Sequence, residues 1–491
     1  MRLNAKQVCA YTGGTMVVPP LASKELLCGV TWDSREVEPG CLFVALMGEK
    51  VNGHSFVGSV LSAGAGAVLV MEPLPQTDLM LARELGAAVI EVADTASALT
   101  DLAREWRGHL KGHVVAITGS TGKTTAKNLV RDVCAAGKTV VATKANQNNE
   151  LGVPRTLLSA DADTQVVVVE MGMRGRGQIA ALCDFVRPDW GLITNVGESH
   201  IELLGSRENI ARAKGELLEA LPSGTGIAFL NGEDDATAFM AQQTQFAARG
   251  VEEVRFNGRP AADCLAPGQV PAAAVWAEDA FLDEEGHPLF TLCAQGFEGL
   301  EPLDEVHRVP VAMALRGYHN ICNGCAAAAV GLRLGLGLQA VAEALGASLP
   351  ESGRQEVLKT RDGVTVVNDA YNANPDSMRA ALRTFAAMET SGRHVAVLGD
   401  MGELGDFAES CHRGVGRAAV CCDRLICVGP LSRFTAQGAL EAGMDAAAVT
   451  AVDSVGQALA LLETELSPHD ALLVKASHYM GLGRIADGLV N

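Results

Sequence analysis

The chain lacks the features of a membrane or secreted protein. Its N-terminus, MRLNAKQVCAYTGG, has no apolar core of signal-peptide length, and no charge-free apolar run is long enough to span a bilayer. Low-complexity tracts and short internal repeats are also missing, which argues against disorder. We therefore expect a soluble, cytoplasmic, monomeric protein that does not insert into membranes.

Aromatic residues and basic residues are both scarce. Only 4% of the chain is aromatic, whereas 48% is hydrophobic and 53 residues are glycine, a composition that suits closely packed helices on parallel sheets. Acidic residues outnumber basic ones 58 to 39, which gives a formal charge of −19. Because this field repels nucleic acid, we expect no nucleic-acid partner, and any anionic ligand must be held by a local site.

The cysteines give no zinc pattern. Of the 13, only Cys322 and Cys325 have metal or redox spacing, and they lack a second CxxC pair at zinc-site distance. Many of the others lie in alanine-rich helical or valine-rich strand segments. We interpret them as small buried hydrophobic residues that stay reduced.

At 491 residues the chain is too long for a single core, and its pattern predicts three consecutive α/β domains. Their predicted bounds are 1–94, 95–350 and 351–491. The central domain is expected to hold a mostly parallel sheet, because its apolar strands are nearly continuous. Residues 258–310 are predicted to be less regular, with a hairpin around HPLFTL. The predicted strands are 40–46, 65–71, 87–92, 113–119, 165–172, 190–197, 226–232, 363–369, 394–400, 424–430 and 471–477.

The segment ITGSTGKTT (117–125) joins an apolar strand to a predicted helix through a glycine-rich turn. Such a turn directs backbone N–H groups and the positive helix end at an anion, usually a nucleotide phosphate. Lys123 would reach the β- and γ-phosphates, and the Thr124 hydroxyl would bind Mg²⁺. The spacing departs from the usual motif because Gly119 stands only three residues before Gly122. A glycine and serine turn with an incidental lysine is the alternative reading.

Two further residues follow strands of the same predicted sheet. Glu170 ends QVVVVE, and His200 lies in the loop GESH after the next strand. Each alone is more often structural. Beside the glycine loop, however, they become candidate ligands for Mg²⁺, which prefers oxygen ligands next to a triphosphate.

Lys214 shares the apolar stripe of its predicted helix with Ile210, Leu217, Leu218 and Leu221. Burial would favour the neutral amine, which could take up CO₂ and form a carbamate, an anionic ligand for a second Mg²⁺. The alternative is a lysine whose apolar stem is buried while its ammonium group reaches water.

The chain as a whole resembles the Mur ligases of bacterial cell-wall synthesis, and among them the members that add D-alanyl-D-alanine. The resemblance covers nearly the whole length. Its motifs are DSREVEPGCLFVAL (33–46), NGHSF (52–56), TGSTGKTT (118–125), TKANQNNELGVP (143–154), VVEMGMRGRGQI (168–179), ITNVGESHIELLGS (193–206), ARAKGE (211–216), GYHNICNG (317–324), NDAYNANPDSM (368–378) and VLGDMGELG (397–405).

This resemblance implies a UDP-sugar domain, a central P-loop ATPase domain and a C-terminal Rossmann-like domain that receives the incoming dipeptide. It implies catalytic roles for Lys123, Glu170, His200 and Lys214. The implied ATP-binding residues are Gly119, Ser120, Thr121, Gly122, Lys123, Thr124, Thr125, Asn320, Arg354 and Asp369. The implied metal ligands are Thr124, Glu170, His200 and Lys214. The implied substrate-binding residues are Ser34, Arg35, Asn52, Gly53, His54, Asn146, Asn148, Asn149, Tyr371 and Asn372.

The implied reaction is an ATP-dependent ligation of D-alanyl-D-alanine to UDP-N-acetylmuramoyl-tripeptide through an acyl phosphate, with two Mg²⁺ ions. The run VKASH departs from the family's VKGSR-like run at Ala476 and His478, and DMGELG has Gly402 where a bulkier residue is usual. The motifs leave open whether the third peptide residue is diaminopimelate or lysine. Alternative functions are a sister ligase that adds diaminopimelate or lysine, a folylpolyglutamate synthase, or a P-loop ATPase that switches a partner.

Overall fold

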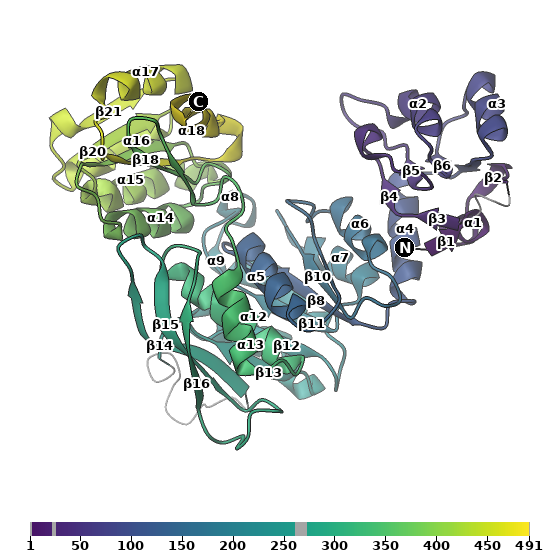
Figure 1. The fold of residues 1–491 in the computed structure, drawn as a ribbon, viewed down its shortest axis with the longest axis horizontal. Coiled ribbons are helices and arrows are strands. Elements are labelled where there is room, and N and C mark those ends of the chain that lie inside the picture. Colours follow the sequence, from purple (N-terminus) through teal and green to yellow (C-terminus); the bar gives the residue numbers. More distant parts are fainter. Residues whose placement is uncertain (1, 22–25, 261–272, 491) are drawn as a thin grey trace.

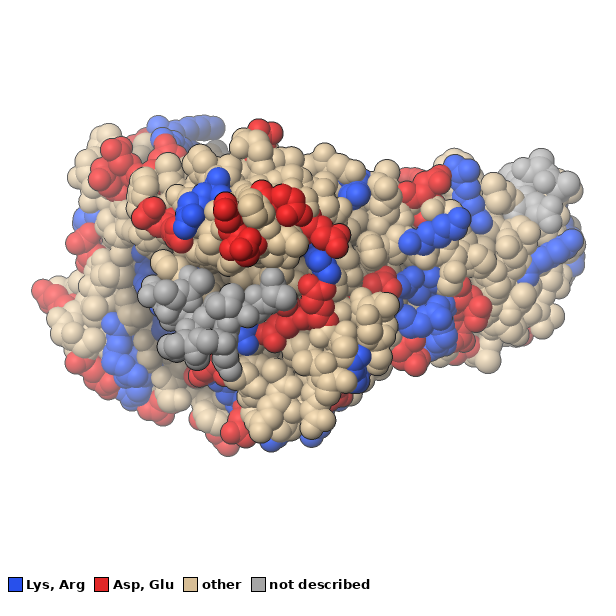
Figure 2. Space-filling view, turned by 90° about the horizontal axis from the view of Figure 1, so that it is seen from below, with Lys and Arg blue, Asp and Glu red and all other residues tan. Residues whose placement is uncertain are grey.

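The computed structural model describes residues 2–21, 26–260 and 273–490. These residues form three lobes that follow one another along the chain (Figure 1). Within them no helix is long and apolar enough to cross a bilayer. On the face shown in Figure 2, acidic and basic side chains are interspersed among uncharged ones.

The N-terminal lobe is built on a mostly parallel sheet of order β2-β7-β6-β5-β4, in which only β2 runs antiparallel to its neighbour. Alternate strand residues such as Phe43 and Val68 pack against α2 and α3. Its elements are β1 (Arg2–Asn4), α1 (Ala5–Thr12), β2 (Thr15–Val18), β3 (Leu26–Cys28), β4 (Val30–Thr31), η2 (Ser34–Glu36), β5 (Leu42–Val44), η3 (Gly53–Phe56), α2 (Val57–Ser62), β6 (Ala67–Val70), α3 (Gln76–Leu85) and β7 (Ala88–Glu91). Helix α4 (Thr95–Arg107), which is capped by Asp94, leads into the next lobe and also packs against it.

The central lobe contains a sheet of order β16-β15-β14-β13-β12-β11-β8-β10-β9. It is parallel from β9 to β14 and antiparallel from β14 to β16. Its elements are β8 (His113–Thr118), α5 (Lys123–Ala135), β9 (Val140–Ala142), α6 (Gly152–Ser159), β10 (Val166–Glu170), α7 (Gln178–Val186), β11 (Trp190–Ile193), α8 (Ile201–Leu204), α9 (Arg207–Glu219), β12 (Ile227–Asn231), α10 (Ala236–Thr244), η4 (Phe246–Arg249), β13 (Glu252–Phe256), β14 (Ala273–Leu282), β15 (Pro288–Gln295), β16 (His307–Ala312), α12 (His319–Arg333) and α13 (Leu338–Ala347).

Helices cover both faces of the central sheet. Val115 and Ile117 of β8 face α5, α12 and α13, whereas Val114 and Ala116 face the other side, with α6, α7 and α9. This arrangement explains the nearly continuous apolar strands. The expected irregular segment is only partly irregular, because β14, β15 and β16 extend the sheet and the hairpin at HPLFTL is confirmed. Residues 261–272 of that segment lie outside the described residues.

The C-terminal lobe has a sheet of order β17-β18-β22-β19-β20-β21, parallel except for β17. Helices α14, α15 and α16 pack on one face, and α17 and α18 pack on the other. Its elements are β17 (Glu356–Lys359), β18 (Thr365–Asn368), α14 (Pro375–Ala387), β19 (His394–Gly399), η5 (Gly405–Phe407), α15 (Ala408–Ala418), η6 (Ala419–Cys421), β20 (Arg424–Val428), α16 (Ser432–Glu441), η7 (Ala446–Ala448), β21 (Val449–Val452), α17 (Val455–Glu465), β22 (Ala471–Lys475), η8 (His478–Met480) and α18 (Gly483–Val490).

Candidate active site

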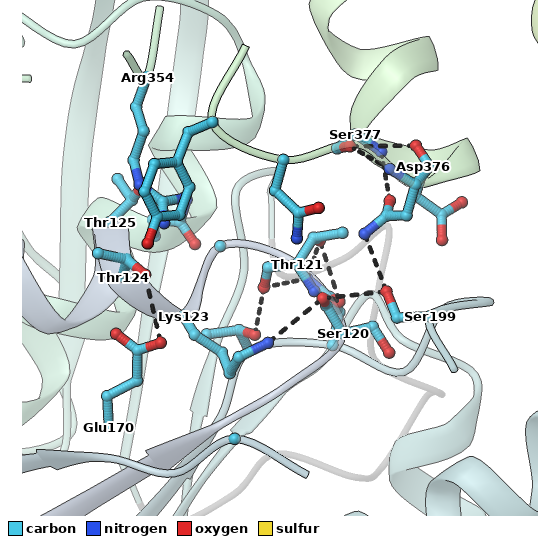
Figure 3. A pocket seen from close by; sticks show the side chains of 18 of the residues that line it. Ser120, Thr121, Lys123, Thr124, Thr125, Glu170, Ser199, Arg354, Asp376 and Ser377 are labelled. Atoms are coloured by element: carbon cyan, nitrogen blue, oxygen red, sulfur yellow. Dashed lines mark hydrogen bonds between the residues drawn. The ribbon is translucent and has the colours of Figure 1, made fainter. Parts of the chain in front are cut away.

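A cleft of about 1770 Å³ lies where the central and C-terminal lobes meet. The carboxyl ends of β8, β10 and β11 open into it, as expected for the ligand crevice of a parallel α/β sheet. Most of the predicted site residues line this cleft: Ser120, Thr121, Gly122, Lys123, Thr124, Thr125, Asn146, Asn148, Asn149, Glu170, His200, Asn320, Arg354, Asp369, Tyr371 and Asn372. Figure 3 shows part of this wall.

The glycine loop connects β8 to α5, and both of its glycines are required by the geometry. A Cβ atom on Gly119 would lie 1.8 Å from Thr194 Oγ1. Gly122 has φ +74°, a left-handed conformation that glycine adopts without strain, and α5 begins directly after it. The predicted strand, turn and helix are therefore present, and the loop lies at the cleft.

The glycine loop is contacted by two asparagines, Asn195 and Asn323, that were not predicted as site residues. Asn195 Oδ1 accepts hydrogen bonds from the Thr121 backbone N–H at 3.0 Å and from the Thr121 hydroxyl at 3.1 Å. The Asn323 side chain on α12 packs so close that a Cβ on Gly122 would lie 2.8 Å from its Oδ1. Both lie in family motifs, at 193–206 and 317–324, but the loop that they contact comes from a distant segment, so the sequence alone did not predict this role.

Lys123 begins α5 and is partly buried. Its Nζ donates a hydrogen bond to the Gly119 carbonyl at 2.8 Å and lies 3.5 Å from the Ser120 carbonyl. Burial lowers the pKa of Lys123, while the nearby Glu170 carboxylate opposes this shift and Arg354 adds to it. Because water screens a partly buried cation less than an exposed one, Lys123 attracts an anion in the cleft strongly.

Glu170 and Thr124 form a pair of candidate oxygen ligands in the cleft. Glu170 is 1% exposed, and its Oε1 accepts from Thr124 Oγ1 at 3.2 Å and from Asn148 Nδ2 at 2.8 Å (Figure 3). Its other oxygen, Oε2, is buried without a hydrogen-bond partner among the described residues. A carboxylate oxygen left unpaired beside a hydroxyl fits a hard divalent cation such as Mg²⁺.

His200 makes its close contact with the C-terminal lobe. Its Nδ1 lies 2.6 Å from Glu403 Oε2, and Glu403 also lies 3.4 Å from Arg174 Nε. Both partners have positive φ, +63° at His200 and +59° at Glu403. This contact with His200 lowers the pKa of Glu403. Within the described residues, no group of three or more His, Cys, Asp and Glu side chains is arranged to hold a metal.

Lys214 lies on the buried face of α9, as its sequence spacing predicted. It is only 1% exposed, among Ile210, Leu217 and Leu218. Burial lowers the pKa of Lys214 well below its usual value, Lys123 lowers it further, and Asp234 opposes the shift. The neutral amine is therefore favoured, and the alternative of an ammonium group in bulk water is wrong for this structure. Lys214 is not among the described residues that line the cleft.

The residues expected to hold a UDP-sugar lie in the N-terminal lobe, away from the central cleft. Ser34 and Arg35 follow β4, and Asn52, Gly53 and His54 follow β5; because β4 and β5 are parallel, the two groups share one sheet edge. His54 Nε2 accepts from the Met71 N–H at 2.9 Å, so its Nδ1–H donates to Asn52 Oδ1 at 2.8 Å.

Arg35 and Arg155 form ion pairs in this N-terminal region. Arg35 pairs with Asp33 at 2.6 Å, and hydrogen bonds from Arg35 lower the pKa of Asp33 to about 2. Arg155 on α6 pairs with Glu36 and lies over the Trp32 ring, 5.1 Å from its centroid, which ties this lobe to the central one.

The C-terminal lobe supplies the opposite wall of the cleft. Asp369 Oδ2 lies 2.7 Å from Lys475 Nζ in a largely buried ion pair. The Arg354 guanidinium lies 4.1 Å from the centre of the Tyr371 ring, and Figure 3 shows it near Thr124 and Thr125 at the start of α5. The Tyr371 ring also lies 5.5 Å from that of His478, one of the residues that depart from the family pattern. Ala476, the other, is fully buried.

The remaining amides and the cysteine pair are local features. Asn149 Oδ1 accepts from the Gly152 N–H, whereas Asn320 Nδ2 donates to the Arg316 carbonyl at 2.7 Å. Cys325 is buried in α12, where burial raises its pKa well above the usual value. A thiol in that state is inert, which fits a packing role for Cys325, whereas Cys322 is half-buried and lines the cleft.

Comparison with known proteins places these features in one family. Three family models match the chain: the Mur ligase family catalytic domain at residues 27–107, the Mur ligase middle domain at 117–331, and the Mur ligase glutamate ligase domain at 353–478.

Individual proteins match over the full length. A UDP-N-acetylmuramoyl-tripeptide–D-alanyl-D-alanine ligase of Mycobacterium bovis is 38% identical over 100% of this chain and 98% of the relative. The protein of that name from Bacillus subtilis is 32% identical over 100% of this chain and 99% of its own. A crystal structure of MurF from Acinetobacter baumannii is 28% identical, with a TM-score of 0.81 over 100% of this chain and 99% of that one. The chain therefore belongs to the Mur ligase family.

Proposed function

We propose that this protein is an ATP-dependent amide ligase that joins D-alanyl-D-alanine to UDP-N-acetylmuramoyl-tripeptide in peptidoglycan synthesis. The observation that carries the proposal is the buried Glu170 carboxylate at the end of β10. One of its oxygens has no hydrogen-bond partner among the described residues, and the other lies 3.2 Å from the hydroxyl of Thr124, which follows the glycine loop at the cleft. The choice of substrates is supported by the names of the full-length relatives.

The proposed division of labour follows the three lobes. Residues 1–94 would bind the UDP-sugar, with Ser34, Arg35, Asn52, Gly53 and His54 at one sheet edge. Residues 95–350 would bind ATP, and residues 351–491 would bind the dipeptide. Arg354 and Asp369 from the third domain would reach the nucleotide, and the amides of Asn146, Asn148 and Asn149 would position the sugar-peptide. We propose a monomeric cytoplasmic enzyme.

The proposed chemistry first activates the peptide carboxylate. One of its oxygens attacks the γ-phosphorus of ATP, ADP leaves, and an acyl phosphate forms. The neutral amine of D-alanyl-D-alanine then attacks the acyl carbon, the amide bond forms, and phosphate leaves with that carboxylate oxygen. Lys123 would stabilise the negative charge on the transferring oxygens, as preorganised cations do in phosphoryl transfer.

Mg²⁺, when bound, would neutralise charge between the carboxylate and the triphosphate. Thr124 and Glu170 are its proposed ligands, and His200 and Lys214 are the proposed ligands of a second ion. For Lys214 the neutral amine would add to CO₂ and lose a proton, giving a carbamate anion. The burial of Lys214 and the lowered pKa of its amine support this step.

Phosphate release from ATP tests the function. We expect release only when both UDP-N-acetylmuramoyl-tripeptide and D-alanyl-D-alanine are present. Release with a single amino acid such as diaminopimelate or lysine in place of the dipeptide would favour a sister ligase, and release with a folate would favour a folylpolyglutamate synthase. Hydrolysis without any sugar-peptide would favour a switch ATPase and overturn the proposal.

A further inference from the structure

Helix α14 of the C-terminal lobe starts directly against the central lobe. Its N-cap, Asn374, and its first-turn residue Asp376 both contact the segment 197–199, which follows β11. The same segment contacts the glycine loop. A short chain of contacts therefore connects the lobe proposed to bind the dipeptide with the loop proposed to bind phosphate.

Three side chains make up this chain of contacts. Asn374 Nδ2 donates to Ser199 Oγ at 2.8 Å, and Ser199 Oγ donates to the Ser120 carbonyl at 3.2 Å. Ser120 Oγ in turn accepts from the Gly197 N–H at 2.8 Å. Ser199 and Ser120 are largely buried in the wall of the cleft (Figure 3).

Asp376 makes further contacts between the two lobes, next to this chain of hydrogen bonds. Its Oδ2 accepts from the Glu198 N–H at 3.3 Å, and its Oδ1 pairs with Arg379, which also reaches Glu198. The Asp376 carboxylate lies so close to Gly197 that a Cβ there would come within 2.1 Å of it. Any side chain at 197 would therefore displace the Asp376 carboxylate and disturb this contact.

The chain of hydrogen bonds ends at the Ser120 carbonyl, which lies beside Lys123. This carbonyl lies 3.5 Å from Lys123 Nζ, so it touches the cation proposed to stabilise the transferring phosphoryl group. Asn374 carries out a second, local task, because its Oδ1 accepts from the Ser377 N–H at 2.9 Å and caps α14. The cap uses the oxygen and the contact between lobes uses the amide nitrogen, so the two tasks can be separated by mutation.

We propose that Asn374 is a positioning residue for the glycine loop. When the C-terminal lobe is docked, Asn374 acts through Ser199 to hold the conformation of this loop. Phosphoryl transfer therefore depends on the lobe that is proposed to bind the dipeptide. This inference rests on the proposed function. The Asn374 amide hydrogen-bonds Ser199, which in turn hydrogen-bonds the Ser120 carbonyl, so Asn374 acts by way of these two serines.

The test replaces the donor and keeps the cap. Asn374→Ser retains an oxygen suited to an N-cap and removes the amide N–H. Asn4→Ser is the matched control, because Asn4 caps α1 through the same capping box and lies far along the chain from the glycine loop. With one hydrogen bond lost, we expect kcat for ligation to fall about 3- to 10-fold in Asn374→Ser and to stay unchanged in Asn4→Ser.

A double-mutant cycle separates positioning from simple loss of stability. Ser199→Ala breaks the same chain, so the double variant Asn374→Ser with Ser199→Ala should be no slower than Ser199→Ala alone. Effects on kcat that multiply in the double variant would show that the two residues act separately and would overturn the proposal. So would a kcat of Asn374→Ser equal to that of the wild type.

Amide hydrogen exchange gives a readout that does not depend on ligation. We expect faster exchange at Ser120 and Thr121 in Asn374→Ser than in the wild type, and unchanged exchange in Asn4→Ser. Equal exchange in all three proteins would contradict the proposed contact chain. If the wild type shows no ligation, the proposed function fails, whereas the exchange comparison still decides the role of Asn374.

Discussion

Replacing Lys214 with methionine should make the protein more stable and almost inactive at the same time. The lysine is 1% exposed and lies among Ile210, Leu217 and Leu218, where an unbranched apolar side chain of similar length fits. Leaving a buried polar group without full compensation costs about 1–3 kcal/mol in proteins. We expect Lys214→Met to recover about that much free energy of unfolding at pH 7, in buffer free of Mg²⁺ and bicarbonate.

The pH dependence of this gain follows from the direction of the pKa shift. Burial lowers the pKa of Lys214 in the folded state below its usual value of 10.5, so between the two values the unfolded chain binds more protons. Stability of the wild type therefore rises as the pH rises toward 10.5, and Lys214→Met lacks this rise. The advantage of the variant should be largest at neutral pH and should shrink at pH 9.

The ligase activity of Lys214→Met should fall although its stability rises. If the Lys214 carbamate is a metal ligand, its loss should lower kcat by about 10²–10³. Urea unfolding at pH 7 and pH 9, with phosphate release on the same samples, checks both effects. A variant less stable than the wild type at pH 7 would refute the burial argument, and near-normal turnover would refute the carbamate.

Three further variants test the rest of the site. Lys123→Ala should keep the fold, by circular dichroism, and lower kcat by about 10²–10³; near-normal turnover would remove Lys123 from phosphoryl transfer. Glu170→Gln should raise the Mg²⁺ concentration needed for half-maximal activity by about 10-fold or more, and an unchanged Mg²⁺ titration would rule out Glu170 as a ligand. Asp369→Ala removes the carboxylate that neutralises the buried Lys475, which keeps only hydrogen bonds to the Asn372 and Asp369 carbonyls, so it should lower the free energy of unfolding by about 3–5 kcal/mol in urea. A loss under about 1 kcal/mol would mean that these carbonyls and water compensate the lysine.

Local patterns in the sequence predicted much of the fold. The apolar strands before Gly119, at Glu170 and after Ser352 are all present, because continuous valine-rich runs can be buried only between two helical layers. The extension by β14, β15 and β16 was underestimated, since its strands alternate in burial and lie among glycine, proline and acidic residues. Short strands such as β13 and β21 left too little pattern to recognise.

The site was predictable where one motif holds the chemistry and not where separate segments meet. Gly119, Lys123 and Thr124 belong to one turn, and Lys214 could be placed by helical spacing alone. Asn195, Asn323 and Glu403 lie inside the family motifs at 193–206, 317–324 and 397–405. They act through residues far away in the chain, however, so the motifs marked these segments and not the contacts that the three side chains make. The contact between Asn374 and Ser199 belongs to the same class, because it exists only when two lobes are docked.

The central claim is that the peptide carboxylate is activated by the γ-phosphoryl group of ATP. Its most direct test uses UDP-N-acetylmuramoyl-tripeptide labelled with ¹⁸O in the carboxylate that is joined, together with ATP, Mg²⁺ and D-alanyl-D-alanine. We predict one ¹⁸O atom in each phosphate released, because that oxygen leaves with the phosphoryl group when the amide forms. Unlabelled phosphate formed alongside the ligated product would contradict the acyl-phosphate route.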